Sequence, residues 1–192
     1  MPEWRGIGEV VRLQVQREPL KASGIYQPGP LLPVERAMVG AAGMLGHDGD
    51  GWVVDAHHTA HPRARGGGNR ALSVGFTGHY AAMDDRFGPV ADGVAGENVI
   101  VAGLPLRMSD VSGGLLVRRP DGTSYELRAP RPAAPCREFT SYLLRSSRVL
   151  DRSELQDELE FLSQGTRGFI VDVSHLHDLH EIALGDSVLA QA

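Results

Sequence analysis

The sequence predicts a mixed α/β fold that is mostly β, a β-barrel with a few peripheral helices. Two observations lead to this prediction. Short apolar or alternating segments recur at frequent intervals along the chain and are bounded by glycine and proline, as strands are. Segments with helical periodicity are few, and they do not alternate regularly with the strands as in βαβ units. Because neither a linker nor an internal repeat divides the 192 residues, we expect a single domain over residues 1–192.

The strands are predicted from apolar and β-branched runs. They cover residues 7–15, 52–60, 71–76, 99–102, 167–173 and 187–190. A hairpin is expected at residues 115–127, because Asp121-Gly122 divides two alternating runs. Residues 21–33 are predicted to form an irregular connection, since prolines and a glycine interrupt them. Residues 34–45 fit either a short strand or a poor helix, because small residues and glycines weaken both patterns.

Three helices are expected between these strands. The first covers residues 77–87, with its first residue as the N-cap and a Gly-Pro pair after its end. The second has Cys136 in its first turn, because an apolar-periodic run follows. The third covers residues 153–162 and begins with a capping box formed by Ser153 and Gln156.

Cys136 is the only cysteine and lies at the start of the second helix. Pro135 precedes it, and proline is favoured in a first helical turn, where its missing N–H leaves no bond unmade. Unpaired N–H groups and the helix dipole favour an anion in that turn, and Arg131 and Arg137 flank the cysteine. We therefore expect a thiol that ionises readily and acts as a nucleophile or metal ligand. The alternative is a small buried side chain without a chemical role.

A histidine-rich segment begins at Asp55. Alternation along the predicted strand would put Asp55 and His57 on one face and His58 on the other. Neither the H-E-x-x-H pattern nor a cysteine–histidine pairing accompanies these residues, so the pattern favours histidines that hydrogen-bond a pocket or a turn over zinc ligands. The histidines near the C-terminal end are interpreted as solvated turn residues: His175, His177 and His180.

Two glycine-containing segments could bind a ligand. Residues 62–70 combine three glycines with three arginines, Arg70 among them, and could close over a phosphate with N–H groups and guanidiniums. A plain surface loop fits the same composition. In residues 93–98, glycines precede Glu97 and Asn98, which indicates tight backbone geometry that presents side chains or amides to a ligand, although ordinary turns have similar sequences.

Composition excludes several classes of partner. The formal net charge of −5 gives no electrostatic reason to expect nucleic acid or an anionic membrane as a partner. A single cysteine excludes an internal disulfide, and the sequence shows no targeting segment. No stretch approaches the roughly 18 apolar residues of a membrane span. We therefore expect a cytoplasmic protein with a reduced thiol.

Four motifs occur in a recognisable order and spacing. They are Gly96-Glu97-Asn98, Pro135-Cys136 after the hairpin and Arg131, Gly165-Thr-Arg-Gly168, and Gly185-Asp186-Ser-Val188. With these motifs the chain resembles the MOSC family, named for the C-terminal domain of molybdenum cofactor sulfurases. The resemblance covers residues 7–189, and Asp48 or Asp50 with the two histidines at 57 and 58 loosely matches an earlier segment of that family.

The resemblance implies a free-standing, MOSC-type β-barrel whose chemistry depends on Cys136. In one activity, Cys136 is a thiolate ligand to molybdenum in a pyranopterin cofactor, and the protein reduces N-hydroxylated small molecules with electrons from a separate electron-transfer protein. The residues expected to bind the cofactor are Gly96, Glu97, Asn98, Arg70, Arg131, Arg137, His57 and His58.

The resemblance leaves two alternatives. Cys136 could carry a persulfide sulfur, received from a sulfur donor in trans, for delivery to a metal–sulfur centre or a cofactor. The domain could also bind the molybdenum cofactor without catalysing a reaction. Metal content separates the first activity from sulfur carriage, and activity with an artificial electron donor separates it from a binding module.

Overall fold

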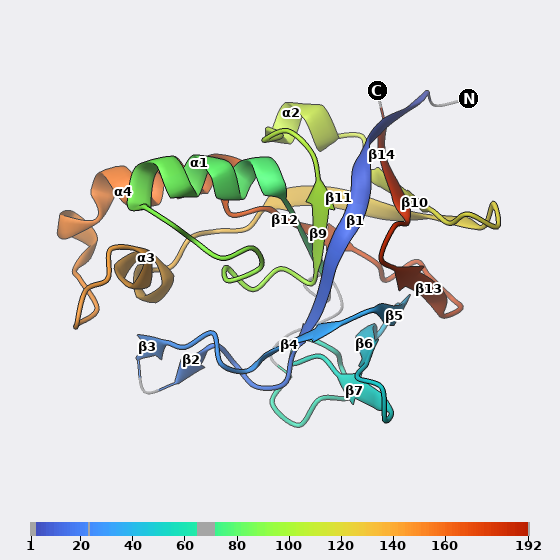
Figure 1. Cartoon of the computed structure of the whole chain (residues 1–192), viewed down its shortest axis with the longest axis horizontal. Helices are drawn as coiled ribbons and strands as arrows, with labels where there is room; N and C mark the ends of the chain where they lie inside the picture. Colours follow the sequence, from blue (N-terminus) through green and yellow to red (C-terminus); the bar gives the residue numbers. More distant parts are fainter. Residues whose placement is uncertain (1–2, 23, 65–71, 192) are drawn as a thin grey trace.

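A closed β-barrel forms the body of the protein in the computed structural model, which describes residues 3–22, 24–64 and 72–191 (Figure 1). The barrel strands are β1 Trp4–Gln16, β8 Leu72–Phe76, β9 Val99–Ala102, β10 Leu115–Arg118, β11 Ser124–Pro132, β12 Phe169–Asp172 and β14 Ser187–Gln191. They pair in the order β14-β10-β11-β12-β8-β9-β1, and β1 pairs with β14 to complete the barrel. The predicted mixed, mostly β fold is confirmed.

Strand β1 closes the barrel because different parts of it pair with different neighbours. Its first half pairs with β14, its middle with β9, and its last residues with β4, Leu31–Val34. The pairing shifts register at Gly6/Gly8 and again at Val10/Arg12. A Cβ atom at position 8 would lie 1.8 Å from the Ala102 carbonyl oxygen, so only glycine allows the two backbones to approach this closely.

A second sheet lies beside the barrel and contains β5 Arg36–Gly40, β6 Gly43–His47, β7 Trp52–Val54 and β13 His180–Ala183. Its order is β13-β5-β6-β7. The ambiguous residues 34–45 therefore form most of a β5–β6 hairpin, with Gly43 at φ +121° where the chain turns back. Residues 21–33 are less irregular than expected, because they include β2 Lys21–Ala22, β3 Ile25–Tyr26 and the start of β4.

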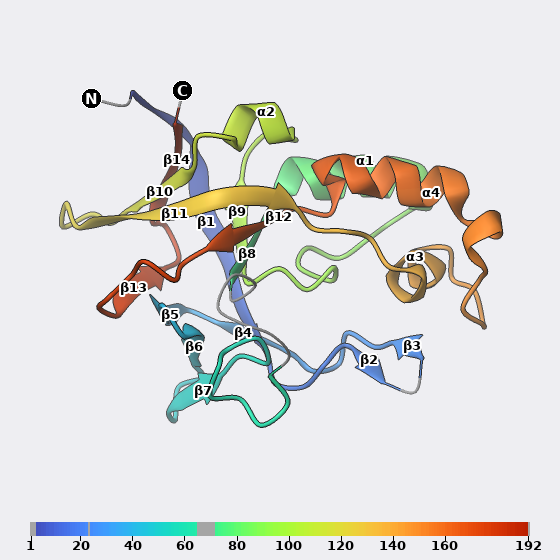
Figure 2. The ribbon, with the colours of Figure 1, turned by 180° about the vertical axis from the view of Figure 1, so that it is seen from behind.

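The helical segments lie outside the barrel. They are α1 Thr77–Phe87, α2 Met108–Val111, α3 Arg137–Leu143, the 3-10 turn η2 Arg152–Glu154, α4 Gln156–Phe161 and the π-helical turn η3 Leu162–Thr166. Both views place α1, α3 and α4 together on one side of the barrel, whereas β10 and β14 lie on the other (Figures 1 and 2). Neither α2 nor the π-helical turn η3 was expected from the sequence.

Two hydrophobic clusters stabilise this arrangement. The larger fills the barrel with inward residues of every barrel strand, among them Leu13, Leu127 and Val171 at 0–1% exposure. The smaller joins the helices to the barrel and the β2–β3 region through Phe139, Tyr80 and Tyr26. The Tyr26 ring lies 5.0 Å from that of Phe139, so the second cluster fixes the start of α3 against the chain near β3.

Three predicted boundaries were wrong. The strand expected over residues 52–60 ends at Val54, because Asp55 turns inward and accepts backbone hydrogen bonds. Thr77 is the first residue of α1 and not its N-cap; its hydroxyl bonds the Gly103 carbonyl instead. The capping box before α4 is formed by Asp151 and Glu154, and not by Ser153 and Gln156, so it begins two residues earlier than predicted. In this box the Asp151 N–H donates to the Glu154 carboxylate at 2.8 Å.

The C-terminal histidines also differ from one another. His177 is exposed, as expected. His180 lies in β13 and stacks on Tyr125 with ring centroids 4.8 Å apart, and His175 is half-buried with Nε2 3.1 Å from the Glu126 carbonyl oxygen. The interpretation as solvated turn residues is therefore wrong for His180, which lies in a strand, whereas His175 lies in a turn but is partly buried against β11.

Candidate functional site

Cys136 is the N-cap residue of α3, one position before the predicted first turn. Its backbone is extended, at φ −121° and ψ 153°, and its carbonyl accepts the Thr140 N–H at 3.0 Å and the Thr140 hydroxyl at 2.9 Å. The side chain is half-buried and lines an open groove of about 1130 Å³ between the start of α3, η2 and α4. The thiol therefore lies at the start of a helix and is accessible from a wide groove.

Glu138 is the acidic neighbour of this thiol. Partial burial raises the pKa of the Glu138 carboxyl, but its own N–H, the Lys21 ammonium and a hydrogen bond from Cys136 together lower it below the usual range. The Lys21 Nζ atom lies 3.5 Å from the Glu138 carboxylate. Lys21 from β2 is thereby tied to the first turn of α3, a contact between segments that are far apart in the sequence.

Arg167 connects the cysteine loop to the loop before β9. Its guanidinium donates to the Ala134 carbonyl at 2.5 Å and to the Ala95 carbonyl at 3.3 Å. The guanidinium carbon also lies 5.3 Å from the centre of the Phe139 ring, within the range of a cation–π contact. Three of the four sequence motifs, around residues 96, 136 and 167, therefore meet at one side chain.

Two glutamines of β1 donate hydrogen bonds to backbone carbonyls of the loop at residues 93–98. Gln14 donates to the carbonyls of Gly93 and Glu97 at 2.6 and 2.7 Å, and Gln16 donates to the carbonyl of Gly96 at 2.8 Å. Gly96 has φ +94°, which L side chains rarely adopt. The tight backbone geometry predicted for this loop is present, and buried side-chain amides enforce it.

Glu97 points into the protein. Its side chain is 2% exposed, and one carboxylate oxygen accepts the Tyr80 hydroxyl at 2.6 Å, whereas the other has no hydrogen-bond partner among the residues that the structure describes. Burial raises the pKa of Glu97, and the Tyr80 hydrogen bond and Arg167 only partly offset this effect. Burial likewise raises the pKa values of Tyr80 and Tyr26. The Glu97 carboxyl is thus a buried acidic group close enough to Arg167 to interact with its charge.

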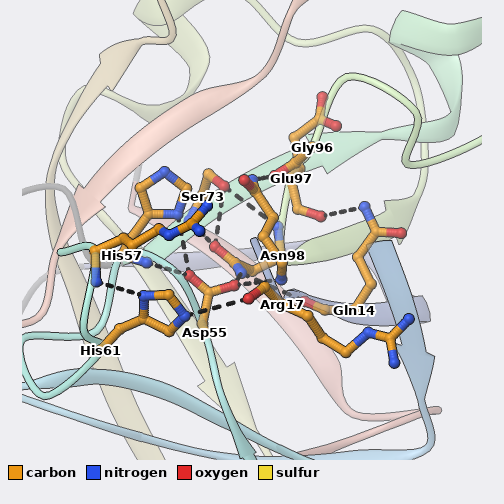
Figure 3. Close-up of polar contacts among 11 residues, drawn as sticks. Gln14, Arg17, Asp55, His57, His61, Ser73, Gly96, Glu97 and Asn98 are labelled. Atoms are coloured by element: carbon orange, nitrogen blue, oxygen red, sulfur yellow. Dashed lines mark hydrogen bonds and ion pairs between the residues drawn. The ribbon is translucent and has the colours of Figure 1, made fainter. Parts of the chain in front are cut away.

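Asn98 is likewise engaged inside the protein (Figure 3). Its amide oxygen accepts from the Ser73 N–H and hydroxyl at 3.1 Å, and its amide nitrogen donates to Asp55 at 2.9 Å and to the Gln14 carbonyl at 3.3 Å. The side chain that was predicted to bind a cofactor therefore joins β8, β1 and the segment after β7.

Asp55 and His57 form a pair that the same network holds in place. The Asp55 carboxylate is 0% exposed and accepts N–H groups from Gln16 and Asn98 on one oxygen and the His57 N–H on the other, at 2.7, 2.9 and 2.8 Å. The His57 Nδ1 atom lies 3.0 Å from that second oxygen, so Nδ1 carries the hydrogen, because the carboxylate has only lone pairs to offer. Figure 3 shows the His57 ring against Asp55, with Nε2 on the far side of the ring.

His58 has a different environment from its neighbour. It is 8% exposed and accepts the Ala60 N–H at Nδ1, at 3.1 Å, and burial lowers the pKa of its imidazole. A Cβ atom at Gly43 would lie 2.8 Å from the His58 backbone, so the histidine packs tightly against β6. The two adjacent histidines therefore have different surroundings, as predicted. Strand alternation is not the cause, because β7 ends at Val54, before both residues.

A basic cavity of about 810 Å³ opens beside this pair. Its charged or titratable lining residues are Lys21, Tyr26, His57, Arg63 and Arg167. Arg63 also pairs with Glu18 at 2.6 Å, with both side chains more than half exposed, so that this pair is weak and can exchange for another anion. The cavity is suited to an anionic ligand, because guanidiniums and an ammonium surround one volume.

The remaining predicted residues have varied positions. Arg131 lies in β11 opposite Ile170, and Arg137 is half exposed, with its guanidinium 3.2 Å from Asp151. Arg70 lies outside the described residues. Lys21 and Arg167 were not predicted as site residues; the only signals were that Lys21 is the single lysine and that Arg167 falls inside the Gly165–Gly168 motif.

Residues 3–22, 24–64 and 72–191 contain no cluster of three or more His, Cys, Asp or Glu side chains suited to a metal ion. No helix in the described part of the chain has the length and apolar character needed to span a membrane. A metal at Cys136 would therefore need most of its ligands from a cofactor.

Comparison with known proteins identifies the fold. No protein-family model matches the chain, and no curated protein sequence matches it. Among solved structures, the YuaD protein from Bacillus subtilis is similar over 99% of this chain and 100% of its own, with 14% identity and a TM-score of 0.58. YiiM from Geobacillus stearothermophilus is 16% identical over 98% of this chain and 76% of its own, with a TM-score of 0.49. At such identities the likeness to YuaD shows a shared fold.

Proposed function

We propose that this protein is a MOSC-type domain that binds a molybdenum-containing pyranopterin through Cys136 and reduces N-hydroxylated compounds. The observation that carries the proposal is the contact at Arg167, which brings the Gly-Glu-Asn loop and the Cys136 loop together at the edge of a basic cavity. Three of the four motifs that resemble the family in sequence are therefore neighbours in space.

The residues fit such a cofactor in two respects. A half-buried thiol at a helix start can serve as a thiolate ligand, and thiolate suits a soft, redox-active metal. A pterin phosphate needs cationic donors, which Lys21, Arg63 and Arg167 supply in one cavity. When bound, the cofactor would supply the electron transfer. The chain itself would orient the cofactor, and its substrate would be a small molecule in the cavity or in the adjoining groove.

We propose that the electrons come from a separate electron-transfer protein. Reduction of an N-hydroxylated compound takes two electrons and two protons and releases water, and a lone cysteine cannot ligate an iron–sulfur cluster by itself. The open groove beside Cys136 gives a partner protein access to the site.

Persulfide carriage by Cys136 is the second candidate, and the same groove favours it. The Cys136 thiolate would attack the outer sulfur of a donor persulfide, form a new S–S bond and release the donor thiolate. This chemistry needs an accessible thiol and no bound metal, and the groove of about 1130 Å³ provides the access.

Metal and pterin analysis of protein from a host that makes molybdenum cofactor tests both candidates. We expect stoichiometric molybdenum and pterin in the wild type and loss of molybdenum in Cys136→Ser. Ser163→Ala, which changes another side chain lining the same groove, serves as the matched control and should keep the metal. Circular dichroism of all three proteins checks that the fold is retained.

The outcomes separate the alternatives. Molybdenum retained in Cys136→Ser would contradict the ligand role. Absence of molybdenum from the wild type, with a mass gain of one sulfur on Cys136, would favour sulfur carriage. Bound molybdenum without reductase activity towards hydroxylaminopurines or amidoximes, with an artificial electron donor, would favour a non-catalytic cofactor-binding module.

A further inference from the structure

The wide groove beside Cys136 has two walls that differ in how their charges are paired. On the wall that contains the cysteine, the Arg137 guanidinium lies 3.2 Å from Asp151. The Glu138 carboxylate on the same wall lies 3.5 Å from the Lys21 ammonium and accepts a hydrogen bond from Cys136. The charges of this wall are therefore already balanced by neighbours in the protein.

The opposite wall is one face of the segment that runs from η2 through α4 into η3. Its lining residues follow helical spacing: Arg152, Ser153, Gln156, Leu159, Glu160 and Ser163. Arg152 and Glu160 are both exposed, and neither charged group forms an ion pair or a hydrogen bond with the residues that the structure describes. This wall therefore presents one positive and one negative charge to the groove, and both are available to a ligand.

The separation of these two charges sets the length of a ligand that could reach both. Arg152 and Glu160 are eight residues apart in the sequence. A rise of about 1.5 Å per residue in an α-helix and about 2.0 Å in a 3-10 turn separates their backbones by roughly 12–14 Å along the wall. A single amino acid is too short for this span. An extended tripeptide covers about 10–11 Å, and the two flexible side chains can close the remaining gap.

We infer that the groove binds an extended zwitterion of about tripeptide length, with its carboxylate on Arg152 and its ammonium on Glu160. The guanidinium donates two parallel hydrogen bonds to the carboxylate, and the ammonium donates to the Glu160 carboxylate. The middle of the ligand contacts Pro135 and Leu159, which line the same groove as the Cys136 thiol. The inference rests on the proposed role of this groove as the route to Cys136 and names its substrate class. It holds for either chemistry at the thiol, because only the ends of the ligand are anchored.

Cys136 reports occupancy of the groove, because it is the only thiol in the chain. The protein without added metal is alkylated with iodoacetamide, a neutral reagent, at increasing concentrations of tri-alanine with free termini, and mass spectrometry follows the adduct. We expect saturating tri-alanine to slow the alkylation at least about threefold, because the bound peptide covers the thiol. Tri-alanine with an acetylated N-terminus or an amidated C-terminus lacks one end charge. Each blocked peptide should need at least about threefold more for half-protection.

Two variants assign each end of the peptide to its residue, with protection measured against the alkylation rate of the same variant without peptide. Arg152→Gln should weaken protection by free tri-alanine at least about threefold and leave protection by the amidated peptide unchanged, because that peptide has no carboxylate. Glu160→Gln should behave in the same way towards the free and the acetylated peptides. Asp157→Asn is the matched control, since Asp157 is exposed on the same helix but does not line the groove, and it should match the wild type.

Three results would overturn the inference. They are no protection of Cys136 by tri-alanine in the wild type, equal protection by the free and blocked peptides, and a loss in Arg152→Gln or Glu160→Gln that is the same for free and blocked peptides. The last result would show a general effect of charge in place of recognition of the two ends. None of these measurements depends on molybdenum content, so the inference and the proposed function can fail separately.

Discussion

Arg167→Met tests whether the Arg167 guanidinium connects the motif loops. Methionine keeps most of the aliphatic stem and removes the donors to Ala134 and Ala95 and the contact with the Phe139 ring. A hydrogen bond from a charged donor contributes about 1.5–3 kcal/mol, and a cation–π contact about 0.5–1 kcal/mol. Because the hydrogen bond to Ala95 is long, at 3.3 Å, and Arg167 is partly exposed, we discount the sum and expect a loss of about 2–4 kcal/mol in the free energy of unfolding.

Urea and thermal unfolding followed by circular dichroism measure this loss. For a protein of this size, about 1 kcal/mol corresponds to about 2–4 °C, so Tm should fall by roughly 4–16 °C. Arg128→Met is the matched control, because Arg128 forms an exposed pair with Glu126, and it should change stability by less than about 0.5 kcal/mol. If Arg167→Met changed stability no more than this control, the connecting role of the guanidinium would be refuted.

Two further predictions concern buried side chains near the site. Burial raises the pKa of Glu97 in the folded protein above its ordinary value of 4.5. The unfolded chain therefore loses this proton at a lower pH than the folded protein does. As a result, the stability of the wild type falls as the pH rises from about 4.5 to the folded pKa. Glu97→Gln removes this pH-dependent loss of stability. Urea unfolding should therefore show the free energy of unfolding of the variant increasing relative to that of the wild type from about pH 4 to about pH 8. A difference between the two proteins that does not change with pH would contradict the burial argument. Phe139 is 0% exposed, so Phe139→Ala should cost about 3–5 kcal/mol, measured by the same method; a loss below about 1 kcal/mol would show that the site collapses around the gap.

Local sequence signals predicted elements whose cause is local. The hairpin at residues 115–127 follows from Asp121-Gly122, and the structure has β10 and β11 pairing from Leu115↔Leu127 to Arg118↔Ser124. Cys136 was placed within one residue of its helix start because proline and an apolar run mark such starts. Strand periodicity failed at residues 52–60, where hydrogen bonds from β1 and from Asn98 bury Asp55 and end the strand.

The candidate site depends on contacts between distant parts of the chain. Lys21 and Glu138 are far apart in the sequence, and so are the two carbonyls that Arg167 joins. No period or spacing encodes such contacts, because they arise only when the barrel closes and α3 packs on its side. Glu97 illustrates the difference: the sequence marked it as a site residue, and the structure turns it inward towards Tyr80.

The sequence by itself determined the mostly β class, the position of the single cysteine at a helix start and the order of the motifs, because propensity, turn chemistry and capping act over a few residues. Tertiary structure decided which of these residues share a site. Closure of the barrel through β1 and β14 brings Lys21, His57, Arg63 and Arg167 around one cavity, and burial fixes Asp55 behind His57. The charge and geometry of that cavity follow from packing between segments that are distant in the chain.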